Sequence, residues 1–146
     1  MPGYADMLRA IGWLLDCEEG HAARIELGDE LVIVSWESAA GLRESRAFEN
    51  PAGIDRLGEA ARAADSPGER SELLRTLGQN LDHDSFPLSS VRERGGFEVV
   101  GQRDDSTLRR WYSLDELRDH SRQRKFQRRR FTPRGRSWWR RLLPFG

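Results

Sequence analysis

Residues 8–16 read LRAIGWLLD, and residues 74–82 read LRTLGQNLD. Five of these nine positions are identical at an offset of 66 residues. The same offset, taken without a gap, also brings apolar residues together further along the chain: Ile25 with Val91, Leu31 with Phe97, Ile33 with Val99, and Val34 with Val100. A repeat at a fixed period is the signature of a duplicated structural unit. The sequence therefore predicts a tandem duplication over roughly residues 5–124.

Both matching segments are expected to form amphipathic helices. Their apolar residues recur at the spacing of one helix face: Leu8, Ile11 and Leu15 in the first segment, and Leu74, Leu77 and Leu81 in the second. Gly12 and Gly78 occupy matched positions inside these helices, where glycine costs about 1 kcal/mol relative to alanine. We therefore expect a close crossing over a neighbouring element at both glycines.

Helix start signals divide the chain. Ser66, Pro67 and Glu69 form a capping pattern with proline at the first helical position, which predicts the boundary between the copies near Ser66. Ser113 and Glu116 form a second capping box, which predicts a helix from Leu114 onward. The last helix of the first copy is expected to begin near residue 54.

Strands are predicted between the two helices of each copy. They are expected at residues 23–27, 31–36 and 42–48 in the first copy, and at 89–93, 97–101 and 107–112 in the second. Glycine at the first turn of each set indicates hairpins. Both third strands end in an aromatic residue.

The predicted fold class is therefore α+β. It is a tandem duplication of an α-β-β-β-α unit, with an antiparallel three-stranded sheet and two helices per copy, the copies packed together. The expected divisions are residues 1–65, residues 66–124 and a basic tail at residues 125–146. Trp13 and Leu14 align with polar residues of the second copy, Gln79 and Asn80. Either these two side chains contact the other copy or a partner, or the core has simply diverged there.

Targeting and redox signals point to the cytoplasm. The single cysteine, Cys17, cannot form an internal disulfide. The N-terminus lacks the basic start and apolar core of a signal peptide, and no apolar run approaches the length of a membrane span. The expected location is cytoplasmic, with peripheral attachment to the inner face of the membrane as a further form.

Residues that could carry catalysis do not form a recognisable set. His21, His83 and His120 are isolated, and a lone cysteine cannot build the usual zinc site. The acidic neighbours of Cys17, such as Glu18, are expected to raise its pKa and leave the thiol inert. We therefore expect no catalytic residue, metal or cofactor, and no small-molecule substrate is identified.

Charge is divided unevenly along the chain. Residues 1–118 carry 14 basic and 23 acidic side chains, whereas residues 119–146 carry 10 basic side chains and one acidic one. An acidic body is thus followed by a basic segment in which aromatic residues are interleaved.

The candidate attachment residues are arginines, one lysine and two tryptophans of this segment: Arg124, Lys125, Arg128, Arg129, Arg130, Arg134, Arg136, Trp138, Trp139, Arg140 and Arg141. Paired tryptophans beside arginines and leucines suit an anionic lipid interface, and arginines with aromatics also suit single-stranded nucleic acid. Alternatively, the segment covers the acidic body or docks on a protein. The sequence favours a non-enzymatic intracellular binding or scaffold protein whose tail attaches to a protein partner or an anionic membrane surface. Nucleic-acid binding and a small enzyme of unknown reaction are the alternatives, and the oligomeric state stays open.

Overall fold

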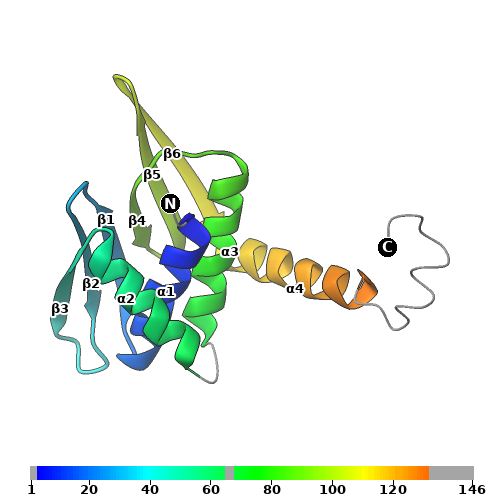
Figure 1. Ribbon diagram of the computed structural model, residues 1–146, viewed down its shortest axis with the longest axis horizontal. Helices are drawn as coiled ribbons and strands as arrows, with labels where there is room; N and C mark the ends of the chain where they lie inside the picture. The colour runs from blue at the N-terminus through cyan, green and yellow to red at the C-terminus, as the bar shows by residue number, and fades with distance from the viewer. Residues whose placement is uncertain (1–2, 65–67, 132–146) are drawn as a thin grey trace.

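A computed structural model describes residues 3–64 and 68–131, with side chains described as far as residue 123. Within these residues the fold is α+β, with four helices and one six-stranded antiparallel sheet (Figure 1). The elements follow in the order α1 (Tyr4–Cys17), β1 (His21–Leu27), β2 (Leu31–Glu37), β3 (Arg43–Glu49), α2 (Ala52–Ala63), α3 (Glu69–His83), β4 (Leu88–Glu93), β5 (Gly96–Arg103), β6 (Ser106–Ser113) and α4 (Leu114–Phe131). All predicted helices and strands are present, with bounds that differ by a few residues at most.

The sheet has the strand order β3-β2-β1-β4-β5-β6. Two hairpin meanders, β1 to β3 and β4 to β6, are therefore joined edge to edge through β1 and β4. Ile25 lies opposite Val91 in this junction, and Arg24 opposite Arg92. Because Ile25 and Val91 are 66 residues apart, the junction is centred on a pair of matched positions.

The core lies between the sheet and the helices α1 and α3, which run side by side over one face of the sheet (Figure 1). The predicted apolar faces are confirmed, since the six side chains that define them are at most 1% exposed: Leu8, Ile11, Leu15, Leu74, Leu77 and Leu81. In the strands, Ile25, Val34, Val91 and Val99 face the helices and are buried. The alternate residues, such as Arg24, point to the opposite, outer face of the sheet.

The helices α1 and α3 run antiparallel and approach each other closely at the two matched glycines. A Cβ atom on Gly12 would lie 2.6 Å from the carbonyl oxygen of Arg70, and one on Gly78 would lie 2.5 Å from the Cα atom of Ala5. No side chain fits in that space, so each helix backbone rests on the first turn of the other. The close crossing expected from the sequence is confirmed.

The ungapped alignment of the second strands is wrong. Ile25 pairs with Val34 in the first meander, and its counterpart Val91 pairs with Val99 in the second. Val34 therefore corresponds to Val99, an offset of 65, because the β4–β5 turn is one residue shorter than the β1–β2 turn. The ungapped offset would have matched buried Val34 with Val100 on the outer face, and a slip of one residue inverts the faces of a strand.

Each half contains one large aromatic ring packed against a glycine, and the aromatic residue and the glycine exchange places between the halves. In the first half, the ring of Trp36 on β2 lies against Gly20, where an added Cβ would be 2.6 Å from it. In the second half, Phe86 occupies the position that matches Gly20, and its ring lies against Gly101. Both aromatics are at most 3% exposed, so each half has one large ring and one glycine there.

The helix α3 begins at Glu69, and Ser66 and Pro67 lie outside the described residues. Its first residue outside the helix, Gly68, provides no side-chain cap. The carboxylate of Asp16 does so instead, accepting hydrogen bonds from the backbone N–H groups of Arg70 and Ser71 at 3.1 and 3.0 Å.

Candidate functional site

The helix α4 is anchored to the body at its start. The N–H of Glu116 donates to the side-chain oxygen of Ser113 at 3.1 Å, as the predicted capping box requires. Leu117 is fully buried. The ring nitrogen Nδ1 of His120 lies 3.1 Å from the side-chain amide nitrogen of Asn80 on α3. The first two turns of α4 are therefore fixed against α3.

An ion pair strengthens this anchor. Two guanidinium nitrogens of Arg118 donate to one carboxylate oxygen of Glu69 at 3.1 and 2.5 Å. The hydrogen bond and the negative charge of Glu69 raise the pKa of Arg118, with a smaller contribution from Asp115. Both side chains are substantially exposed, so the pair orients α4 more than it stabilises the fold.

Beyond this anchor, α4 extends away from the body (Figure 1). Its 18 residues span about 27 Å at 1.5 Å per residue. The helix carries the backbone of Arg124, Lys125 and residues 128–130, whose side chains are not among those described. The other candidate tail residues lie outside the described chain: Arg134, Arg136, Trp138, Trp139, Arg140 and Arg141.

The two candidates for contact between the copies lie on α1. Leu14 is 3% exposed and belongs to the shared core. Trp13 is half-buried and packs against the same core.

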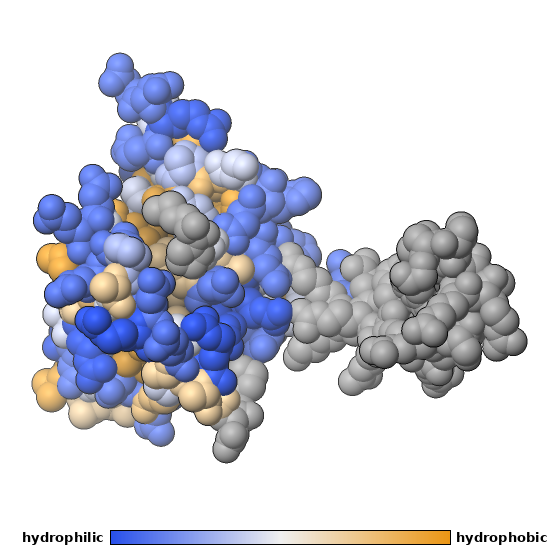
Figure 2. Space-filling model, in the orientation of Figure 1, coloured by the Kyte–Doolittle hydropathy of each residue, from blue (hydrophilic) through white to orange (hydrophobic). Residues whose placement is uncertain are grey.

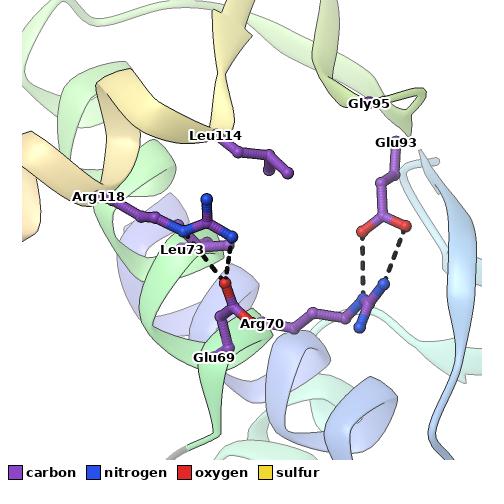
Figure 3. Close-up of a pocket in the computed structure, with 7 residues that line it drawn as sticks. All are labelled: Glu69, Arg70, Leu73, Glu93, Gly95, Leu114 and Arg118. Carbon is purple, nitrogen blue, oxygen red and sulfur yellow. Dashed lines mark hydrogen bonds and ion pairs between the residues drawn. The ribbon is translucent and has the colours of Figure 1, made fainter.

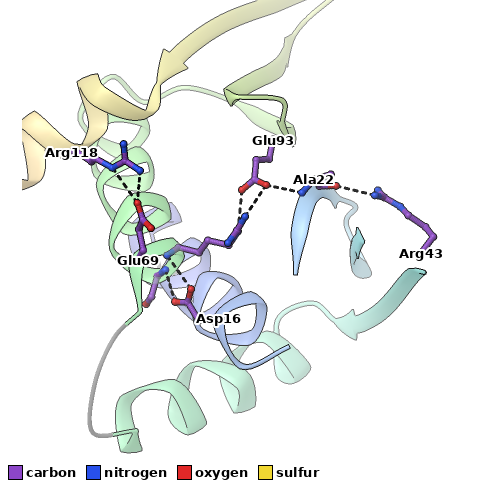
Figure 4. A network of polar contacts seen from close by, with 8 residues as sticks. Asp16, Ala22, Arg43, Glu69, Glu93 and Arg118 are labelled. Atoms are coloured by element: carbon purple, nitrogen blue, oxygen red, sulfur yellow. Dashed lines mark hydrogen bonds and ion pairs between the residues drawn. The ribbon is translucent and has the colours of Figure 1, made fainter. Parts of the chain in front are cut away.

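A network of polar contacts links the two halves at the start of β1 and the end of β4 (Figure 4). Glu93 accepts two hydrogen bonds from the guanidinium of Arg70 at 3.1 Å each, and a third from the N–H of Ala22 at 2.7 Å. The carbonyl of Ala22 accepts from Arg43 at 2.9 Å. Ala22 lies where the β1–β2 register shifts, so side chains satisfy the backbone groups that the ladder leaves unpaired there.

A small pocket opens beside this network, between α3, the β4–β5 turn and the start of α4 (Figure 3). Its volume is about 150 Å³, and its charged lining comprises Glu69, Arg70, Glu93 and Arg118. Both arginines are paired with these two carboxylates, so the pocket presents no uncompensated charge to a ligand. Its polar groups stabilise the junction of the elements.

The outer face of the sheet carries a shallow hollow of about 510 Å³ over β1, β2 and β4. Leu31 and Ile33 line it and are 45% and 40% exposed. Arg24 and Glu26, also in the lining, form an ion pair at 3.0 Å. The hollow thus mixes aliphatic residues with mutually paired charges. On the opposite side of the molecule, the visible surface is largely hydrophilic (Figure 2).

The two aspartates next to His83 in the sequence have separate partners. Asp82 accepts hydrogen bonds from the N–H groups of Tyr4 and Ala5 at 2.8 and 3.0 Å, and Asp84 pairs with Arg110 at 2.6 Å. The carboxylates that precede and follow His83 in the sequence therefore make separate structural contacts.

Cys17 lies at the exposed end of α1. Partial burial raises the pKa of its thiol, and the negative charges of Asp16 and Glu18 raise it further. The predicted direction is confirmed, although desolvation is the larger cause. Among the described residues, no three histidine, cysteine or acidic side chains lie together as a metal site would require. None of the described helices is long and apolar enough to cross a bilayer.

Sequence reasoning missed the roles of Asp16 and Asp82. Both belong to the five identities of the repeat, and each caps the opposite helix. An identical acid at the end of two matched helices was the available signal. The contacts of Glu93 with Arg70 and Ala22 had no such signal, because they join segments that are far apart in the sequence.

Comparisons with known proteins give no relative: no protein-family model, no curated protein and no solved structure matches this chain.

Proposed function

We propose that this protein is a non-enzymatic scaffold, built by duplication of an α-β-β-β-α unit, which attaches to an anionic membrane surface through its basic C-terminal segment. The direction of α4 is the observation that carries the attachment.

The duplication is supported by contacts that repeat under exchange of the halves. Gly12 rests on the start of α3 and Gly78 on the start of α1. The two helices are capped reciprocally by Asp16 and Asp82. The β1–β4 junction is centred on a matched pair. Such self-complementary contacts are those of a two-fold dimer, which a duplication would fuse into one chain.

The direction of α4 supports a role in attachment. A basic segment that folded back would be neutralised by the acidic body, whose first 118 residues carry nine more acidic than basic side chains. The described helix instead leaves the body and carries its basic stretch outward (Figure 1). Positive charge displayed away from the acidic body lets an anionic surface be approached without repulsion from that body.

The chemistry of the segment favours a lipid surface. Residues 137–145 read SWWRRLLPF, and residues 124–131 read RKFQRRRF. Indole rings prefer the headgroup level of a bilayer, and each basic residue near an anionic leaflet contributes about 1 kcal/mol. Aromatic anchors combined with a polybasic stretch supply the two signals that stable peripheral binding requires.

Co-sedimentation with vesicles tests the proposal. The full chain should pellet with phosphatidylcholine vesicles that contain phosphatidylserine, and much less with phosphatidylcholine alone. A chain ending at Pro133 should lose most of the binding. Replacing both Trp138 and Trp139 by alanine keeps the charge and should weaken binding through the lost interfacial anchors. Equal pelleting of the full and shortened chains would exclude the membrane role.

A matched control separates the segment from general charge. The triple change Arg128→Gln, Arg129→Gln and Arg130→Gln should weaken vesicle binding by roughly a hundredfold. Replacing three exposed arginines of the body by glutamine lowers the net charge equally and should change vesicle binding little; these are Arg56, Arg92 and Arg94. Tight binding to single-stranded RNA or to an acidic protein, with none to vesicles, would replace the proposed partner.

A further inference from the structure

The six-stranded sheet ends in two edge strands, β3 and β6. We infer that β3 is an interface for a second copy of this chain, in which the two β3 strands pair antiparallel about a two-fold axis at Ser45. The inference concerns the body of the protein and does not rest on the proposed membrane role.

The backbone of β3 is open for such pairing. In the described residues no strand pairs with β3 on its far side, and β3 forms the outermost strand of the ribbon (Figure 1). The carbonyl of Leu42 accepts from Ser38, and the N–H of Asn50 donates to Glu30. Even-numbered residues thus point their backbone groups toward β2, and by the alternation of an antiparallel ladder the odd-numbered ones point outward.

The side chains select one register. With Ser45 opposite Ser45 of the second copy, Glu44 lies opposite Arg46 of that copy, and the same pair recurs across the axis. Both residues then occupy non-hydrogen-bonded positions, where opposed side chains are closest. Among the described residues, Arg46 makes a long contact of 3.7 Å with Glu18, and the side chains of Glu44 and Arg46 are both exposed. Both side chains can therefore form the cross-strand pairs.

The same register covers an exposed apolar residue. Leu42 is 65% exposed, the most among the exposed large hydrophobic residues of the described chain. It lies just before β3 and opposite Phe48 of the second copy. Phe48 is itself only partly buried against the core. The contact would remove apolar surface from water at both ends of the paired strands.

Neighbouring registers are disfavoured by charge. Centring the pair on Arg46 would place this arginine opposite Arg46 of the second copy. Centring it on Ala47 would place Arg46 opposite Phe48 and leave Glu44 without its partner. Opposite charges directly across a strand pair are stabilising and like charges are destabilising, so the axis at Ser45 is preferred.

The other edge lacks this self-complementarity. The strand β6 reads STLRRWYS and contains no acidic residue. An antiparallel pair of β6 strands centred on Arg109 or Arg110 would bring arginines together. Charged residues on edge strands normally prevent association. No register of two β6 strands can form a cross-strand pair of opposite charges, whereas the alternating charges of β3 can pair with a second copy.

The expected association is weak. One pair of seven-residue strands buries less surface than the roughly 1,200 Å² at which stable interfaces begin. The full chain should therefore be a monomer in dilute solution and should dimerise as its concentration rises.

Sedimentation equilibrium of the full chain over a concentration series provides the test. Glu44→Arg alone and Arg46→Glu alone each turn attractive pairs into repulsive ones, and each should weaken dimerisation roughly tenfold. The combined exchange Glu44→Arg with Arg46→Glu should restore it, because the pairs are then reversed but still complementary. Arg109→Glu on β6 is the matched control and should leave the dimer unchanged.

Ser45→Pro gives a second, charge-independent variant. The N–H of Ser45 faces the open edge, where proline is tolerated in a strand, so the monomer should fold while the central backbone bonds of the dimer are lost. Circular dichroism verifies the fold of each variant. A full chain that stays monomeric at every concentration would overturn the inference. So would a combined charge exchange that remains as weak as the single changes, or an equal effect of Arg109→Glu.

Discussion

Asp16 and Asp82 each cap the first turn of the helix that carries the other. They are matched positions of the repeat, and both accept two backbone hydrogen bonds across the interface between α1 and α3. Orphan N–H groups at a helix start are therefore satisfied by the opposite half of the chain. Neither helix can be capped in this way unless both halves are folded together.

Loss of either cap should destabilise the whole fold. Asp16→Ala and Asp82→Ala should each lower the free energy of unfolding by about 1 kcal/mol, in the range of about 0.5 to 2 kcal/mol for N-cap replacements. Urea denaturation followed by circular dichroism measures the loss. Glu59→Ala, at an exposed position of α2, is the control and should change stability little. Equal stability of all three variants would contradict the capping role.

Glycine replacement should have opposite effects at different helices. Gly12→Ala and Gly78→Ala place a methyl group within 2.6 Å of the facing backbone, so both should destabilise despite the better helix propensity of alanine. Gly58→Ala on α2 meets only the end of Arg62, at 3.5 Å, and should stabilise by up to about 1 kcal/mol. Thermal melts of the three variants give the signs. Stabilisation by Gly12→Ala would contradict the close crossing.

The aromatic and glycine positions of the second half should be coupled. Phe86→Gly alone opens a cavity and should cost about 3 to 5 kcal/mol. Gly101→Trp alone places a second ring against Phe86 and a Cβ atom 2.6 Å from the carbonyl oxygen of Pro87, so it should cost at least about 1 to 3 kcal/mol. The double change reproduces the arrangement of Trp36 on Gly20, so it should cost less than the sum. A double-mutant cycle in urea measures this coupling. Strictly additive costs would show that the two sites are independent.

Alkylation of Cys17 should be slow near neutral pH. Only the thiolate reacts, and the raised pKa means that less thiolate is present at pH 8 than in a free cysteine, whose pKa is about 8.5. The rate with iodoacetamide should therefore rise at higher pH than the rate for a cysteine peptide.

Removing a neighbouring charge tests the cause. Glu18→Gln takes away one of the negative charges that raise the pKa, so it should speed alkylation at pH 8. Glu59→Gln is the distant control and should leave the rate unchanged. A faster rate than the peptide in the unmodified protein would contradict the raised pKa.

Local patterns predicted the elements well because local physics determines them. The spacing of Leu8, Ile11 and Leu15 marks a helix face, and Ser113 starts a helix with its own side chain. Gly12 and Gly78 indicated a close crossing because glycine inside a helix needs a reason.

The partners that residues meet across the fold were not predicted. The cap on α3 comes from Asp16, 54 residues before Arg70, so the serine and proline before the helix gave no indication of it. The one-residue difference between the hairpin turns was concealed because Ile33 and Val34 are both apolar, and either alignment gave plausible matches. Only the pairing of Val99 with Val91 distinguishes them.

The strand order also determines which strand pairings join segments that are far apart in the sequence. Every strand pairing except β1 with β4 joins consecutive strands. Each meander can therefore form quickly from short loop closures, and the single non-local pairing, with Ile25 against Val91, must wait until both meanders are present. Because this pairing closes the longest stretch of chain in the sheet, we expect it to form after the hairpin pairings within each meander.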